Sequence, residues 1–204
     1  MATPRRMEPR ATERALSAPV RGGRLAENGV LGMAIAVFVE VMLFAGFISA
    51  FVIVRHSTPP GLWPPPDQPR LPFATTAVNT AMLLASGVML VLANRAFRRH
   101  AALSAQRRMG VAILLGGLFV LVQGAEWVRL IGQGLTLTSS QLGSFFYVIV
   151  GAHGLHAAVA LGVLLVDWRA MRAGRLSGSA FGAAQLFWYF VVLMWPAIYL
   201  VVYR

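Results

Sequence analysis

Hydrophobic residues along the chain gather into five long stretches, at 30–54, 73–94, 109–131, 143–166 and 181–203. Each is about 22 to 25 residues long, so as an α-helix it measures about 33 to 37 Å and exceeds the ~30 Å hydrocarbon core of a bilayer. Backbone polar groups find no partners in lipid, so each stretch must be helical. The pattern predicts an all-α fold: a polytopic membrane bundle of five transmembrane helices.

The polar segments between these stretches are short, apart from the first 29 residues. Residues 1–29 contain six Arg and three Pro without an apolar period, and we expect a disordered basic tail followed by one five-helix domain at 30–204. A cleaved signal or transit peptide is the alternative, but the next stretch is of spanning length and no small-residue cleavage site follows it. The linker 55–72 has seven Pro, which predicts an extended, stiff surface loop.

Arginine is distributed unevenly between the two sides of this predicted bundle. The tail and the linkers 95–108 and 167–180 contain six, five and three Arg, whereas the opposite side has four. The positive-inside rule therefore predicts a cytoplasmic N-terminus and an outer C-terminus. The net charge of +11 does not indicate nucleic-acid binding, because the Arg residues occupy short linkers and form no basic stripe on a folded domain.

Composition narrows the chemistry further. The chain is 57% hydrophobic and 12% charged, against about 25% charged in soluble domains. It contains no Cys, which excludes disulfides, thiolate catalysis, iron–sulfur ligation and thioether haem attachment. Nothing forms a nucleophile–base pair or a phosphate-binding loop, so we expect no active site in this chain itself.

Two acidic residues inside the predicted spans are candidates for function, because an ionisable side chain in lipid needs a reason. Glu40 lies about ten residues, or ~15 Å, into the first span, near mid-membrane. It is either a proton-relay site or a neutral acid hydrogen-bonded between helices. Glu126 shares a helix face with Gln123 and Arg129, which favours a Glu–Arg pair over a second proton site.

His153 and His156 lie three residues apart on one side of the fourth span. A metal site would need ligands from other spans, yet the other two His residues, His56 and His100, lie in linkers. A Glu-x-x-His motif, typical of di-iron bundles, is also missing. We therefore expect no metal or haem here, and predict interhelical hydrogen bonds or contact with a lipid head group.

Small and polar residues predict how the helices pack. Gly154, Ala158 and Gly162 recur every four residues, a spacing that allows another helix to approach closely. Asn79 and Ser86 share one face of the second span, where they can hydrogen-bond to a neighbour. Five Trp residues mostly lie near predicted span ends, as in an aromatic belt, with the last two fitting least well: Trp63, Trp127, Trp168, Trp188 and Trp195.

Several sequence fragments occur in an order typical of one family. They are EVMLF from Glu40, WPP from Trp63, NT from Asn79, QGAEW from Gln123, GSFF from Gly143, GAHGLH from Gly151 and FWYF from Phe187. In this order, over about residues 30–203, the chain resembles subunit III of the haem–copper respiratory oxidases. Where many members have His and Asp in the last span, this chain has Tyr189 and Val192.

The resemblance implies a fold and a set of partners. Longer members have seven helices, divided two and five by a lipid-filled cleft, and this chain looks like the five-helix form. The family itself binds no haem or copper; it packs on oxidase subunit I, which has those cofactors and reduces oxygen, with subunit II in the same complex. Bound phospholipid and support of proton uptake are implied for the chain, with Glu40 as the buried acid and His153, His156 and Glu126 packing the bundle and meeting lipid.

We therefore expect a non-catalytic subunit III of a terminal oxidase in a bacterial inner membrane, with cytochrome c or quinol as the electron donor of the complex. Three alternatives make different predictions. An accessory subunit of nitric oxide reductase would co-purify with other partners. A small proton-coupled carrier would transport by itself through Glu40, although the spans show no inverted repeat. A haem-binding membrane enzyme would lose its absorption band when His153 is replaced.

Overall fold

The computed structural model describes residues 21–59, 63, 69 and 72–203, and in these residues all regular structure is helical. The five helices are α2 (Arg21–Ser57), α3 (Phe73–Arg98), α4 (Ala102–Gly132), α5 (Gln141–Arg172) and α6 (Gly178–Val202). Each is long and apolar enough to cross a membrane. The predicted all-α architecture with five transmembrane helices is confirmed.

The helices extend further than the hydrophobic stretches do, and α2 shows the largest difference. Hydropathy predicted a span beginning at residue 30, whereas α2 begins at Arg21 and its candidate span begins at Gly29. Helical backbone can continue beyond the lipid, where water and head groups accept polar side chains, so hydropathy marks the span and not the helix end. Residues 1–20 of the predicted tail lie outside the described residues.

Turn and cap residues end the helices at the linkers. His100, Gly134 and Gly174 have positive φ of 56°, 90° and 66°, and the amide after each donates to the carbonyl five positions earlier at 2.9 to 3.0 Å. This is the left-handed helix stop that glycine adopts most easily. Ser140 and Ser177 are the N-cap residues of α5 and α6. Each hydroxyl accepts a hydrogen bond from the backbone amide three residues later, at 3.0 and 3.2 Å.

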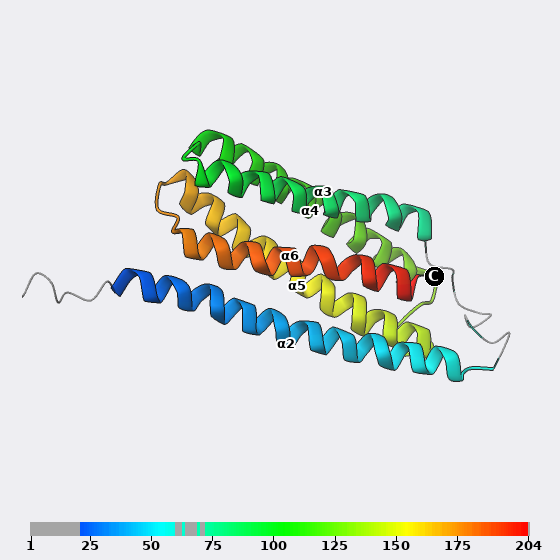
Figure 1. The fold of residues 1–204 in the computed structure, drawn as a ribbon. Helices are drawn as coiled ribbons and strands as arrows, with labels where there is room; N and C mark the ends of the chain where they lie inside the picture. Colours follow the sequence, from blue (N-terminus) through cyan, green and yellow to red (C-terminus); the bar gives the residue numbers. More distant parts are fainter. Residues whose placement is uncertain (1–20, 60–62, 64–68, 70–71, 204) are drawn as a thin grey trace, which may run out of the picture.

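The helices run roughly alongside one another, with α6 between the α3–α4 pair and α2 (Figure 1). Helix α5 packs on α4 and α6, and α2 lies along α6 and α5 on one side of the bundle. The Arg-rich linkers that follow α3 and α5 lie at the end of the bundle where α2 begins (Figure 1). The C-terminus and the linker after α4 lie at the other end.

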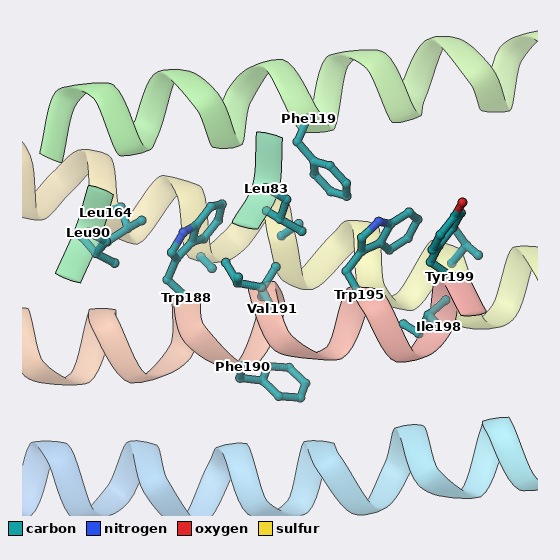
Figure 2. Packing of buried hydrophobic residues seen from close by; sticks show 14 of the residues in the cluster. Leu83, Leu90, Phe119, Leu164, Trp188, Phe190, Val191, Trp195, Ile198 and Tyr199 are labelled. Carbon is teal, nitrogen blue, oxygen red and sulfur yellow. The ribbon is translucent and has the colours of Figure 1, made fainter. Parts of the chain in front are cut away.

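Two tryptophans of α6 form the centre of this core (Figure 2). Trp188 and Trp195 are both 0% exposed, so they do not belong to an interfacial aromatic belt as their type suggested. Their indole N–H groups donate to α3, from Trp188 to the Ser86 hydroxyl at 3.1 Å and from Trp195 to the Thr80 hydroxyl at 2.9 Å. Gly116 of α4 makes room for the Trp188 ring, since a Cβ there would lie 2.6 Å from it. The indoles thus provide both volume and interhelical hydrogen bonds.

Candidate functional site

The structure brings Glu40 of α2 and His156 of α5 together in the middle of the bundle. His156 Nε2 lies 3.1 Å from Glu40 Oε2, and the two side chains are 18% and 31% exposed. Glu40 lies in the middle third of its candidate span, Gly29–Ser57, and His156 is near the centre of α5. Two polar side chains from different helices therefore meet where lipid offers them no other partner.

The proton on this pair can be placed by considering the other imidazole nitrogen. His156 Nδ1 lies 2.7 Å from the Ala152 carbonyl, which can only accept, so Nδ1 has the hydrogen. Nε2 then needs a single proton shared with Glu40: either the carboxyl is protonated and donates to Nε2, or an imidazolium donates to a carboxylate. Both forms are neutral overall, which suits the low dielectric of the membrane.

Aromatic rings and a groove surround the Glu40–His156 pair. Phe44, one turn after Glu40, lies with its ring centroid 5.6 Å from that of His156, and Phe187 and Phe190 of α6 lie 6.3 and 5.9 Å away. The open side faces a groove of about 310 Å³ between α2 and α5, otherwise lined by apolar side chains. The Glu40–His156 pair therefore provides the polar side chains at the floor of an otherwise apolar groove.

His153 lies one turn from His156 but has a different environment. It is 1% exposed, its ring centroid is 5.1 Å from that of Trp195 and 6.2 Å from that of Phe44, and neither ring nitrogen has a hydrogen-bond partner among the described residues. It lines a cavity between α4 and α5. The two histidines that looked equivalent in sequence therefore face different surroundings.

A second polar cluster joins α3, α4 and the end of α6. Asn79 Nδ2 donates to Gln123 Oε1 at 3.3 Å, and Gln123 Nε2 donates to the Tyr203 hydroxyl at 2.9 Å. Glu126 lies close enough to Tyr203 to influence it electrostatically, and burial is the main cause that raises the Tyr203 pKa. Arg129 is exposed and forms no ion pair with Glu126 in the described structure. The proposed Glu–Arg pair is therefore not among the contacts seen.

The small-residue stripe on α5 meets another helix of this chain at one of its three positions. A Cβ on Gly154 would lie 3.3 Å from the Trp127 ring of α4. Ala158 and Gly162 are exposed, and a Cβ on Gly162 would meet nothing within 4 Å. Most of the stripe therefore faces outward from the described bundle.

Two further residues from the sequence analysis, Trp63 and Ser86, contribute to packing. The sequence analysis missed one hydrogen-bond partner, Thr80. Trp63 is half-buried, with its ring centroid 5.6 Å from that of Phe51. Ser86 donates to the Ala112 carbonyl at 2.7 Å, in addition to accepting from α6. Thr80, the acceptor of Trp195, was not singled out as a site residue; its hydroxyl inside an apolar span was the available signal. Among the described residues, no three His, Asp or Glu side chains are grouped to hold a metal ion.

Fold and site together define a multi-pass helical membrane protein with a half-buried acid–imidazole pair. The family model for cytochrome c oxidase subunit III matches residues 23–204. The chain belongs to this family, as the fragments in its sequence predicted.

Curated relatives agree with the family match. Cytochrome c oxidase subunit 3 of Synechocystis sp. is 31% identical over 178 residues, covering 85% of this chain and 74% of the relative. The subunit 3 proteins of Gadus morhua and Oryctolagus cuniculus are 34% and 32% identical over 179 residues, covering 84% of this chain and 67% of each relative. The predicted function as oxidase subunit III is confirmed, and the nitric oxide reductase and carrier alternatives are not favoured. Such a subunit belongs to a hetero-oligomeric oxidase complex.

Proposed function

We propose that this chain stabilises subunit I of the oxidase, with subunit II in the same complex, in a bacterial inner membrane. The haem and copper reside in those partners. The outward-facing Ala158 and Gly162 support docking of a partner helix, because small residues allow backbones to approach closely in lipid. The N-terminus is cytoplasmic, since the Arg-rich linkers and the start of α2 share one end of the bundle.

Phospholipid binds in the groove between α2 and α5. The groove has about 310 Å³ of space, and its walls include Met33, Val37, Leu155 and Val159, which suit an acyl chain. Glu40 and His156 lie on its floor at mid-membrane depth, which an acyl chain reaches and a head group does not. His153 faces the opposite cavity and contributes to packing instead.

The Glu40–His156 pair supports proton uptake by the complex. The observation that carries this proposal is the 3.1 Å contact with Nδ1 held by the Ala152 carbonyl, which leaves one exchangeable proton between Nε2 and the carboxyl. Loss of that proton leaves one negative charge on the pair, which is costly inside a membrane, so the pair passes the proton on as another replaces it. Chemistry on oxygen takes place in the partner subunits.

The proposal is tested on the purified complex by following oxygen consumption against pH. Glu40→Gln keeps the shape and can donate an amide N–H to Nε2, but it cannot exchange a carboxyl proton. We expect normal turnover at low pH and a several-fold loss at high pH, where protons from bulk water are scarce. His56→Gln, at an exposed position in the last turn of the same helix, is the control. A Glu40→Gln complex with the wild-type pH profile would contradict this role.

A further inference from the structure

A cavity of about 120 Å³ lies between α4 and α5, on the side of α5 away from the lipid groove. Its walls include Gln123, Gly124 and Trp127 from α4, and His153 and Gly154 from α5. A water molecule takes about 30 Å³ in the liquid, so the cavity has room for several. Most of its lining is apolar, and the exceptions decide what it can bind.

Two polar groups on this lining have no protein partner. His153 is 1% exposed, and neither Nδ1 nor Nε2 has a hydrogen-bond partner among the described residues. The Trp127 indole N–H is also buried without one. Buried polar groups in proteins are nearly always paired with protein or ordered water, and lipid acyl chains cannot replace either. These atoms therefore indicate a ligand.

The hydrogen-bonding capacity of three nitrogens, the Trp127 indole nitrogen and the two ring nitrogens of His153, indicates which ligand fits. Trp127 can only donate, whereas a neutral His153 presents one donor and one acceptor, so the ligand must both accept and donate. An acyl chain does neither, and an ester carbonyl cannot donate to the bare imidazole nitrogen. We infer that this cavity is a water-binding site inside the membrane, in which water bridges Trp127 of α4 to His153 of α5.

This site is separate from the Glu40–His156 pair. His156 does not line the cavity; its nitrogens face Glu40 and the Ala152 carbonyl. The fully buried Phe44 ring packs against both imidazoles, with centroid distances of 6.2 Å to His153 and 5.6 Å to His156. The inference therefore stands independently of the role proposed for the pair.

Gly124 gives a way to fill the cavity without disturbing its walls. A Cβ at this position would meet no atom within 4 Å, although the residue lines the cavity. Gly124→Leu should therefore extend into the space that water would occupy, with Gly124→Ala as the milder version. Gly46→Leu is the matched control, because Gly46 on α2 is equally open and does not line this cavity.

X-ray hydroxyl-radical footprinting of the complete protein in lipid-retaining detergent tests the inference, because radicals formed from bound water oxidise the side chains beside it. Mass spectrometry gives an oxidation rate for each residue. We expect His153 to be oxidised at least five-fold faster than Trp188, which is equally buried but bonded to Ser86. Gly124→Leu should reduce the His153 rate several-fold, Gly124→Ala less, and Gly46→Leu not at all.

Three results would overturn the inference that this cavity binds water. A His153 rate as low as that of Trp188 in the wild-type protein overturns the inference, whether or not any variant folds. So does a His153 rate that Gly124→Leu leaves unchanged. Native mass spectrometry covers the remaining occupant: a lipid retained by the wild type and lost from Gly124→Leu, with His153 unoxidised, would assign the cavity to lipid and exclude water.

Discussion

Glu40 and His156 show how a membrane helix accommodates an acid near its middle. The two side chains share one proton, and the Ala152 carbonyl fixes which imidazole nitrogen faces the acid. The pair is therefore neutral in both of its hydrogen-bonded forms, which limits the cost of burying it. Three aromatic rings, those of Phe44, Phe187 and Phe190, surround His156 and limit the access of water to it.

The proton shared by Glu40 and His156 predicts an order of stability among variants at position 40. Glu40→Gln should unfold at nearly the wild-type temperature, since its amide N–H can donate to His156 Nε2. Glu40→Leu should lose about 1–3 kcal/mol, because it leaves Nε2 buried without a partner. Thermal unfolding in detergent measures both. If the Gln variant is as unstable as the Leu variant, the shared-proton geometry is incorrect.

Sequence reasoning at the residue scale identified Glu40 and both histidines, because polar residues stand out in hydrophobic spans. It could not pair Glu40 with His156, since the two lie on different helices and their contact depends on how α2 and α5 are rotated. The Glu126–Arg129 expectation failed to appear for a related reason. Sharing a helix face brings two residues near each other but does not fix their side-chain directions; Arg129 is exposed, whereas Glu126 is half-buried.

At the scale of elements, helix α6 is the centre of packing. Trp188 and Trp195 project from it toward α3 and α4, whereas Phe190 points toward α2 (Figure 2). The Trp188 ring reaches across to α4 at Gly116, where a Cβ would lie 2.6 Å from the ring. Lipid does not drive helices together as water does, so such fitted contacts and interhelical hydrogen bonds provide most of the association energy.

Adjacent glycines on α4 provide a matched pair to test this fit. Gly116→Ala would place a Cβ 2.6 Å from the Trp188 ring, and we expect a loss of about 1–3 kcal/mol from overpacking. At Gly117 the nearest atom would be 3.9 Å away, so Gly117→Ala should be neutral or gain up to about 1 kcal/mol of helix propensity. Denaturation in mixed micelles compares them. Equal effects at both positions would count against the fit.

The number and type of elements followed from hydropathy, because each span must be long, apolar and helical. The buried face of most helices did not follow, since a spanning helix is apolar on nearly all sides; α3 is the exception, because Asn79 and Ser86 mark the face that bonds to α4. Trp188 and Trp195 illustrate this for α6. Tryptophan is common both at the membrane interface and in the core of a bundle, and only the packing of α6 against α3 shows that these two residues lie in the core. Hydropathy could not predict that α2 begins at Arg21, because the first residues of this helix lie outside the hydrophobic stretch.

For the whole molecule, alternating helices carry the Arg-rich linkers to one end of the bundle (Figure 1). The chain contains no Cys, so single cysteines can report which end faces outward. In intact spheroplasts, we expect a membrane-impermeant maleimide to label Leu137→Cys, in the linker after α4. Arg175→Cys, in the linker after α5, should be labelled after permeabilisation alone. The reverse pattern would contradict the proposed cytoplasmic N-terminus.

If this chain works as one subunit of an oxidase complex, it should purify together with its partner subunits. A tagged chain is isolated in mild detergent with lipid retained, and then analysed by mass spectrometry and by a reduced-minus-oxidised absorption spectrum. We predict a many-span haem-containing partner in stoichiometric amount, with haem bands in the spectrum. A colourless chain that is recovered alone under these conditions would contradict the account.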